Sequence, residues 1–202
     1  WSPDSRKVYF LSDRAKPGVH QLYSISPESG EATALTDWEP GIAGYMPLPD
    51  GKRIALMAKD PETAEQKRRK EERDDAEIFG EDWPYHRLRL LDLESRDVTT
   101  LNVLGDRHVV DVVSEPDGSR LLVKTWETPE TDKAFHAVDL WIVDPDADTA
   151  HHVCRHSASV DDMCWAPDET IVVLATHPDR FHAGTSIWTV PAAGGDLREV
   201  IA

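Results

Sequence analysis

The densest group of side chains able to bind a metal ion is His151-His152-Val153-Cys154-Arg155-His156. Imidazole and thiolate groups are the usual ligands of zinc. If this segment is a strand, His152, Cys154 and His156 share one face at two-residue spacing, too close for all three to converge on one ion without a bend. Structural zinc sites of this kind normally add a second, distant pair of ligands. We therefore predict no metal site, and the sequence indicates no cofactor.

A nucleophilic serine would be expected on a strand-to-helix elbow with the pattern Gly-x-Ser-x-Gly. The nearest match is Gly184-Thr185-Ser186-Ile187-Trp188, which fails at its last position and lies in a predicted strand. No glycine-rich phosphate loop occurs either. The chain therefore offers no catalytic residue of its own, and its enzymatic status stays open on these motifs alone.

A loop rich in aromatic and charged residues is the strongest candidate for a binding site. It reads Ile78-Phe79-Gly80-Glu81-Asp82-Trp83-Pro84-Tyr85-His86-Arg87. Loops held on a rigid scaffold commonly carry binding residues. We predict a substrate-binding or domain-docking role for Glu81, Asp82, Trp83, Tyr85 and Arg87. Trp83 and Tyr85 equally fit a structural role, in which they seat the loop against a sheet.

This loop closes an insertion over residues 60–85. Its start, Asp60-Pro61-Glu62-Thr63, predicts a helix with Asp60 as the N-cap and Pro61 at the first helical position. Oppositely charged residues follow at four-residue spacing: Glu65 with Arg69, Lys67 with Glu71, and Arg68 with Glu72. There is no apolar stripe. The segment is either a solvated helix or mobile arm, or a charged arm that contacts a partner domain.

The element that must position this insertion is a fourfold repeat. A proline-aspartate step recurs as Trp1-Ser2-Pro3-Asp4-Ser5, Leu48-Pro49-Asp50-Gly51, Glu115-Pro116-Asp117-Gly118 and Trp165-Ala166-Pro167-Asp168-Glu169. Such a step predicts a tight turn between two strands, because proline sets φ, aspartate bonds the downstream backbone and glycine takes positive φ. Apolar residues align without gaps five and seven positions after each proline: Val8, Ile54, Leu121 and Val172, then Phe10, Leu56, Val123 and Leu174.

A later strand recurs as Leu22–Ile25, Leu88–Leu91, Leu140–Val143 and Ile187–Val190. Its distance to the next proline is almost constant, so the length variation lies in one loop, between the second and third strands of each unit. Stacked units accept insertions only where they project away from the shared core. We predict four units, over about 1–40, 41–106, 107–157 and 158–202, the first of which lacks its own first strand.

Short strands separated by regular turn signals indicate an all-β fold. Several strands, most clearly Ile171-Val172-Val173-Leu174-Ala175, are apolar at every position and should be covered on both faces. Units of about four antiparallel strands with two covered faces predict a β-propeller, here a partial one. A two-sheet sandwich is the alternative, but it does not explain the constant frame of the units.

Propeller strands run alternately up and down, so the second-to-third loops and the crossovers between units emerge on one rim. The insertion should therefore lie beside the crossovers at Thr36-Asp37-Trp38-Glu39-Pro40, Leu104-Gly105-Asp106-Arg107 and Arg155-His156-Ser157. Whatever the chain binds is expected to contact that rim.

The formal charge of −16, from 38 acidic and 22 basic residues, disfavours nucleic acid and anionic membranes as partners. No segment has the apolar length that crosses a bilayer. Cys154 and Cys164 are too few for a disulfide framework, which indicates a reducing, cytoplasmic location. The chain opens on Trp1 in the middle of a repeat, so we expect a piece of a longer protein.

With these residues in view, the chain resembles the propeller of prolyl-oligopeptidase-family serine peptidases, in particular the acylaminoacyl-peptidase-like branch. The resemblance is carried by the Trp-Ser-Pro-Asp-Ser and Trp-Ala-Pro-Asp anchors, the Leu-Trp-x-Val-Asp strand and, above all, the insertion. The matching segments are Leu140–Asp144, Lys67–Glu72, Asp74-Asp75 and Glu81–Tyr85 followed by Arg87-Leu88. The resemblance covers the whole chain.

The resemblance implies a larger enzyme in which a propeller caps an α/β-hydrolase domain and admits only short peptides or acyl-peptides. The hydrolase domain and its nucleophile elbow are absent from this chain, so no catalytic residue is transferred. Half a ring would leave a sheet face exposed, and self-association is then expected. The alternative is a non-enzymatic Tol-type or WD-like propeller that binds proteins. The chain lacks the Gly-His and Trp-Asp repeat signature, and a generic platform does not need the insertion.

Overall fold

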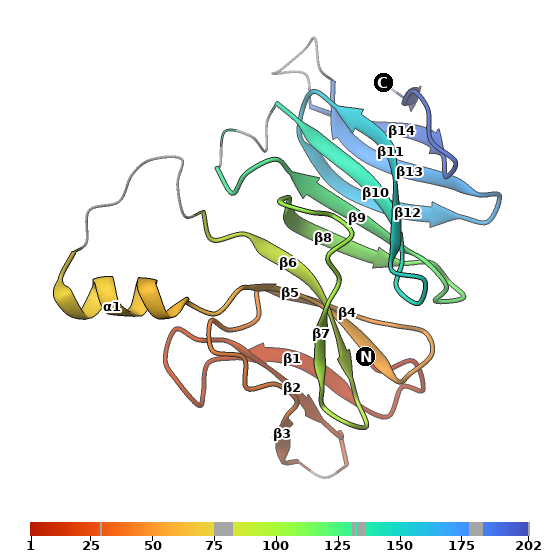
Figure 1. Cartoon of the computed structure of the whole chain (residues 1–202). Coiled ribbons are helices and arrows are strands. Elements are labelled where there is room, and N and C mark those ends of the chain that lie inside the picture. The colour runs from red at the N-terminus through yellow and green to blue at the C-terminus, as the bar shows by residue number, and fades with distance from the viewer. Residues whose placement is uncertain (29, 75–82, 131, 133–135, 178–183, 202) are drawn as a thin grey trace.

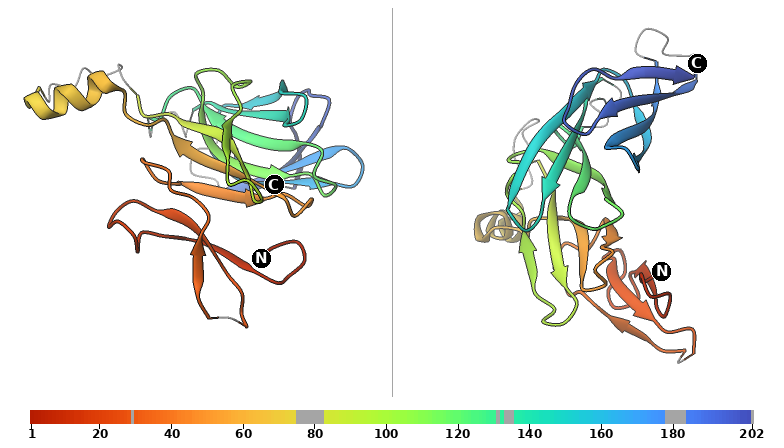
Figure 2. Two further views of the ribbon diagram at one scale, coloured as in Figure 1. Left: turned by 60° about the horizontal axis from the view of Figure 1, so that its bottom comes forward. Right: turned by 90° about the vertical axis from the view of Figure 1, so that its right-hand side faces the viewer.

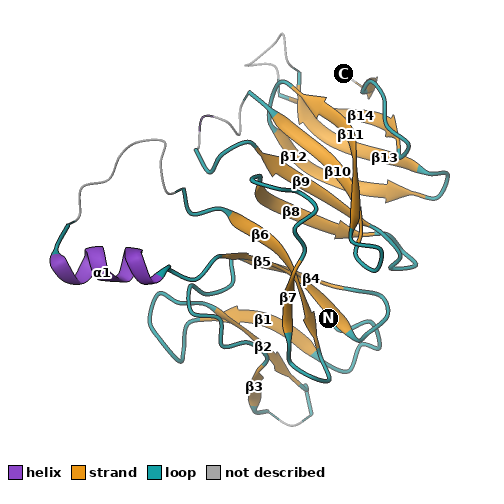
Figure 3. Cartoon of the chain, viewed as in Figure 1, coloured by secondary structure: helices purple, strands orange, loops and turns teal. Residues whose placement is uncertain are grey.

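The structure, a computed structural model, describes residues 1–28, 30–74, 83–130, 132, 136–177 and 184–201. Strands account for nearly all of its regular structure, and one helix projects from the side of the sheets (Figure 3). No helix within these ranges is long and apolar enough to cross a membrane.

The strands form four antiparallel sheets that follow one another along the chain (Figure 1). The first sheet contains β1 (Val8–Ser12), β2 (Gln21–Ile25) and β3 (Ala32–Ala34). The second contains β4 (Gly44–Pro47), β5 (Arg53–Lys59), β6 (His86–Asp92) and β7 (Val98–Thr100). The third contains β8 (His108–Ser114), β9 (Leu121–Trp126), β10 (Val138–Asp144) and β11 (Thr149–His156). The fourth contains β12 (Val160–Ala166), β13 (Thr170–Thr176), β14 (Thr185–Pro191) and β15 (Arg198–Ile201).

Within each sheet the spatial order of the strands is their order in the chain. The sheets succeed each other along a curve from the N-terminal to the C-terminal end (Figure 2). The predicted all-β fold, a partial β-propeller of four repeat units, is confirmed. The first sheet has three strands, as expected from its missing first strand.

The apolar strands are covered on both faces where a sheet lies on each side. In β9, Leu121 and Val123 pack into the core between the second and third sheets, whereas Leu122 packs into the core between the third and fourth. All three side chains are fully buried. A third core, which includes Tyr9, Leu22 and Ile54, joins the first and second sheets. Each sheet is therefore held by the apolar surfaces of its neighbours.

The strand pairing in the fourth unit differs by one residue from the gapless alignment of the repeats. Trp165 pairs with Ile171, whereas Ser114, at the same distance before its proline, pairs with Leu121. The turn of the fourth unit is thus one residue shorter, and Ile171 and Val173, not Val172 and Leu174, are its inward residues. Leu174 is 37% exposed. Because residues 171–175 of β13 are all apolar, they show no polar-apolar alternation from which the register could be predicted.

The fourth sheet is also covered on one face only. Leu174, Ile187 and Val200 are exposed on the side away from the third sheet. The prediction that the β13 segment is covered on both faces is therefore wrong for this chain, since the described residues provide no further sheet to pack there.

The four proline-aspartate turns have the predicted geometry. The residue two positions after each proline has positive φ in every copy: Ser5 at 58°, Gly51 at 67°, Gly118 at 80° and Glu169 at 60°. The carboxylates of Asp4, Asp50 and Asp117 accept downstream backbone N–H groups, as Asp50 does from Lys52 at 2.8 Å and Arg53 at 3.0 Å. The sequence step thus fixes the reversal even where glycine is replaced.

The insertion forms α1 (Ala64–Glu72), but its start differs from the prediction. Thr63, not Asp60, is the N-cap, in a capping box with Gln66. Thr63 accepts from the Gln66 N–H at 3.2 Å, and Gln66 Oε1 accepts from the Thr63 N–H at 2.9 Å. Asp60 is instead engaged by two arginines of β6, so proline at position 61 precedes the helix.

No residue of α1 is buried, and the helix extends away from the sheets (Figures 1 and 2). Of the predicted pairs, Glu65 contacts Arg69 at 3.6 Å. Lys67 instead contacts Glu39, on the crossover to the second sheet, at 2.7 Å, and Arg68 contacts Glu65 at 2.7 Å. The helix is therefore stabilised by its caps and by surface ion pairs.

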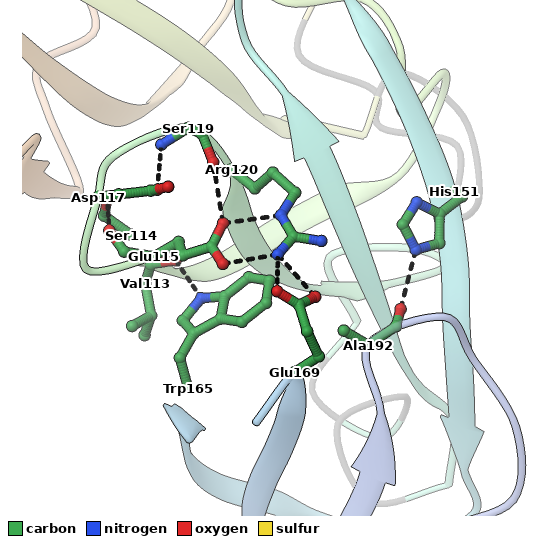
Figure 4. Close-up of polar contacts among 10 residues, drawn as sticks. All are labelled: Val113, Ser114, Glu115, Asp117, Ser119, Arg120, His151, Trp165, Glu169 and Ala192. Carbon is green, nitrogen blue, oxygen red and sulfur yellow. Dashed lines mark hydrogen bonds and ion pairs between the residues drawn. The ribbon is translucent and has the colours of Figure 1, made fainter. Parts of the chain in front are cut away.

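At the end of the sheets opposite the insertion, a network around Arg120 joins the third and fourth sheets (Figure 4). Its guanidinium donates to both oxygens of Glu115, at 2.7 and 2.6 Å, and to Glu169 at 2.8 Å. It also lies over the Trp165 ring, 5.0 Å from the centroid. Arg53, at the same position after its own proline, contacts Asp146 of the third sheet. Equivalent arginines thus link successive sheets.

We expect Arg120→Ala to lower the free energy of unfolding by about 1–2 kcal/mol, because the variant loses charge-assisted hydrogen bonds across the seam. Urea denaturation monitored by tryptophan fluorescence measures the change. Arg6→Ala, an exposed position in the corresponding turn of the first unit, is the matched control and should change stability by less than about 0.5 kcal/mol. Equal effects of the two substitutions would show that the network does not stabilise the seam.

Candidate functional site

The loops between second and third strands and the crossovers between sheets meet at one rim, and polar residues at one repeated position tie them together. Gln21, Arg87 and Asp139 each precede the recurring leucine of the third strand. Gln21 Nε2 donates to the Trp38 carbonyl at 2.7 Å, and Trp38 belongs to the first crossover. Arg87 and Asp139 make the corresponding contacts with the next two crossovers. The geometry expected for the rim is therefore present.

The Arg87 guanidinium contacts both the insertion and the crossover to the third sheet. Nη1 donates to the Gly105 carbonyl at 2.6 Å, and Nη2 contacts Asp106 at 3.0 Å. Nε contacts Asp60 at 3.3 Å, and the guanidinium lies over the Tyr85 ring at 5.0 Å. Arg87 thus connects the start of the insertion, its end and the crossover to the third sheet. Its role in this structure is to order the rim.

Beside it, Asp60 also pairs with Arg89, whose side chain is 3% exposed. The Arg89 guanidinium lies 4.4 Å from the Trp38 ring centroid and donates to Thr100. Its Nε is buried without a hydrogen-bond partner in the described part of the chain. Trp38 in turn donates from Nε1 to the Lys59 carbonyl at 2.8 Å. Because loss of Asp60 would remove an ion-pair partner of the buried Arg89 guanidinium, this pair helps to hold the insertion to the rim.

An aromatic and histidine cluster continues from the end of the insertion onto the third sheet. The His86 and His108 rings are tilted by 30° with centroids 4.6 Å apart, and the backbone N–H of His86 donates to His108 Nδ1 at 3.1 Å. Tyr85 and Trp126 flank His108 at 6.5 and 5.6 Å. His108 is 7% exposed. Tyr85 therefore helps to seat the end of the insertion, one of the two roles that the sequence left open.

Burial dominates the acid-base behaviour of these histidines. It lowers the pKa of His108 from 6.5 to about 4, with smaller contributions from His86 and Lys59. Burial, and next the charge of Lys59, also lower the pKa of His86. Both rings are thus neutral near pH 7, and they supply hydrogen-bonding groups without adding charge.

A second polar cluster lies on the third sheet around Asp139, whose side chain is 2% exposed. Arg107 contacts its carboxylate at 2.7 Å, and His152 Nε2 lies 2.8 Å from it. Arg155, at the end of β11 beside the following crossover, is 3.9 Å away and pairs more closely with Glu127 at 2.8 Å. These partners compensate the buried charge, and they fix two crossovers to one strand.

The histidine-cysteine segment does not have the arrangement expected from its spacing. A register shift places Cys154 opposite Leu140 and His152 opposite Trp141, so Val153 is an extra residue in β11. His152 is consequently exposed while Cys154 and His156 are buried. Burial, together with Asp139, raises the pKa of Cys154 to about 12. Among the described residues, no three His, Cys, Asp or Glu side chains gather closely enough to hold a metal ion.

The predicted site residues are only partly described by the structure. Tyr85 and Arg87 lie together on the rim, and Trp83 is half-buried near them. Glu81 and Asp82 lie outside the described residues. Sequence reasoning missed Asp60, Arg89, His108 and Asp139. The repeat held a signal for Asp139, because it occupies the same position as Gln21 and Arg87.

Comparison with known proteins adds to this geometry. No family model matches the chain. A curated relative, the uncharacterized peptidase YuxL of Bacillus subtilis, is 32% identical over 158 residues, which are 71% of this chain and 23% of that protein. A solved structure from a structural and mechanistic analysis of two prolyl endopeptidases superposes on this chain with a TM-score of 0.66. The sequence identity is 17%, and the match covers 98% of this chain and 27% of that chain.

The acylaminoacyl peptidase of Pyrococcus horikoshii gives a TM-score of 0.61 at 14% identity, over 98% of this chain and 31% of that one. The resemblance to the propellers of prolyl-oligopeptidase-family peptidases is confirmed. TolB of Acinetobacter baumannii has the same fold, with a TM-score of 0.62 at 15% identity over 100% of this chain and 42% of TolB. This propeller chain spans about a quarter of the curated relative that it matches.

The neutral state of His108 in the folded propeller makes stability depend on pH. Between pH 6.5 and 4 the unfolded state binds a proton that the folded state does not, so the free energy of unfolding falls as pH falls. We expect His108 to contribute a loss of about 2–3 kcal/mol across this window. Urea denaturation of wild type and His108→Asn, which retains an acceptor near Nδ1, measures it.

His108→Asn should lose a corresponding part of the pH dependence, since its side chain does not titrate. His136→Asn, at an exposed position, is the control for loss of a histidine as such. If the free energy of unfolding fell equally steeply with falling pH in wild type and in His108→Asn, the result would contradict a neutral, buried His108.

Proposed function

We propose that this chain is the non-catalytic propeller segment of a serine peptidase that cleaves short peptides or acyl-peptides. In this proposal the propeller restricts access to the active site and docks an α/β-hydrolase domain of the same polypeptide. The observation that carries it is the 32% identity to a protein named as a peptidase, over 71% of this chain. The TolB propellers match in fold at 15–16% identity only.

The rim supports this proposal physically. A gate must keep its shape when substrate arrives, and Arg87, Asp60 and Arg89 tie the insertion to the adjoining crossover by ion pairs. Preformed loops lose less conformational entropy on binding than mobile ones. On this view Glu81, Asp82, Trp83, Tyr85 and Arg87 face the hydrolase domain or the path to its active site.

A TolB-like, non-enzymatic platform for protein binding is the second candidate, favoured by the coverage of the whole chain by TolB. The two functions differ in what the complete protein does. The peptidase requires a Gly-x-Ser-x-Gly elbow encoded beyond Ala202 and labelling of its serine by a fluorophosphonate probe. A complete protein that lacks both, and that hydrolyses no short acetyl-peptide anilide, would eliminate the peptidase and leave the platform.

If the rim limits substrate size, Arg87→Ala in the complete protein should relax that limit. The variant loses the contacts with Gly105, Asp106 and Asp60 that hold the insertion against the crossover. We expect the ratio of kcat/KM for a peptide of about ten residues to that for a tripeptide to rise about 3-fold or more. Fluorogenic peptides of graded length measure the ratio.

Arg6→Ala, at an exposed site on the opposite end of the sheets, is the control and should leave the ratio unchanged. Thermal unfolding of both variants separates relaxed selectivity from general loss of structure. An unchanged ratio in a folded Arg87→Ala protein would remove the rim from substrate selection.

A further inference from the structure

A small hollow of roughly 180 Å³ lies at the base of the insertion. The chain leaves the second sheet at Lys59 and returns at His86, and these two residues are directly paired across β5 and β6. Both line the hollow, together with Gly18, His20 and the crossover segment 40–43. The rim network described above borders this hollow but does not fill it.

Lys59 differs from its neighbours in having no carboxylate partner. It is exposed, and among the described residues no acidic side chain lies within ion-pair distance of it. Two acidic residues near the hollow are engaged elsewhere. Asp60 pairs with Arg87 and Arg89, and Glu39 pairs with Lys67 at 2.7 Å. Within the described ranges, no side chain of the adjoining segments forms an ion pair with Lys59.

The remaining acidic residue of the adjoining loop, Asp13, accepts the Gly18 N–H at 3.0 Å. The charge of Lys59 acts on both rings of the histidine pair, where it adds to burial in lowering the pKa of His86 and His108. Of these two histidines, His86 lines the hollow, and its neutral ring adds no charge beside Lys59.

Gly41 allows the crossover segment that lines the hollow to lie against the loop before β2. Its φ is +83°, and a Cβ at this position would lie 2.9 Å from the carbonyl oxygen of His20. Only glycine therefore allows the crossover to approach the loop before β2 so closely. The backbone conformation on this side of the hollow therefore depends on a glycine at position 41.

We propose that this hollow binds a carboxylate group presented by a peptide, with Lys59 as the charged contact. The chain carries a net charge of −16, which repels anions over most of the surface, so an anion gains only where positive charge is local and unpaired. The inference rests on the proposed function for the peptide nature of the ligand. A C-terminal carboxylate and an acidic side chain present the same group.

The test measures binding of three short peptides by isothermal titration calorimetry. Acetyl-trialanine carries a terminal carboxylate, acetyl-trialanine amide carries none, and acetyl-Ala-Glu-Ala amide carries only a side-chain carboxylate. We expect one of the two carboxylate peptides, or both, to bind at least about 5-fold more tightly than the neutral amide at low salt, with the difference reduced by added salt. Which of them binds identifies the source of the carboxylate.

Substitutions of Lys59 test whether the preference for carboxylate peptides arises at the hollow. Lys59→Gln should abolish the preference for carboxylate, and Lys59→Arg should retain most of it because the charge is kept. Lys52→Gln removes an equally exposed lysine from the opposite end of β5 and should retain the preference in full. In ¹⁵N NMR spectra, the carboxylate peptide should shift the amide signals of Gly18 and Gly41.

Equal binding of the neutral amide and both carboxylate peptides would overturn the proposal, as would an undiminished preference in Lys59→Gln. Assays of the complete protein separate this result from the proposed function. Carboxylate-selective binding without peptide hydrolysis would contradict the peptidase and uphold the hollow. Hydrolysis without carboxylate selectivity would do the reverse.

Discussion

The structure depends on the packing of neighbouring sheets against one another, which covers both faces of the second and third sheets. A strand such as β9 buries Leu121 and Val123 on one side and Leu122 on the other, so it has no face left for water. This constraint explains why variable segments occur only at the strand ends. It also explains the exposed Leu174, Ile187 and Val200 of the fourth sheet, where the described residues place no neighbour. Apolar burial thus sets the architecture, and polar chemistry is confined to its two ends.

The two ends use polar residues in different ways. At the turn end, Arg53 and Arg120 follow their prolines at the same distance and reach an acidic residue of the next sheet. At the rim, Gln21, Arg87 and Asp139 occupy one repeated position but differ in charge and in partners. At the turn end, the same kind of ion pair, from arginine to a carboxylate, recurs between neighbouring sheets. The rim varies a single position, as expected for the end that differs in function.

The rim is where the insertion becomes part of the propeller. No residue of α1 is buried, yet the two ends of the insertion are held by Asp60, Arg87 and Arg89 and by the contact between the rings of His86 and His108. A solvated arm is therefore attached to an ordered stem. This arrangement supports a peptidase gate more directly than a generic platform, since it places ordered charged and aromatic groups beside one crossover. The 32% identity to a named peptidase agrees with that interpretation.

The sequence alone determined the repeat, the strands and the turns, because these follow from local rules. Proline fixes φ, aspartate caps the turn, and apolar runs mark strands wherever they occur. It also predicted one rim for the insertion and the crossovers, since alternating strand direction leaves no other choice.

The tertiary structure decided what depends on distant partners. Asp60 was a sound N-cap by local criteria, but Arg87 and Arg89 compete for its carboxylate, and Thr63 caps the helix instead. The five consecutive apolar residues 171–175 of β13 gave no indication of register, so the turn shortened by one residue was visible only in the pairing of β13 with β12. The extra residue at Val153 likewise leaves His152 exposed and Cys154 buried. Charge competition and register are properties of pairs of segments, and a single segment does not encode them.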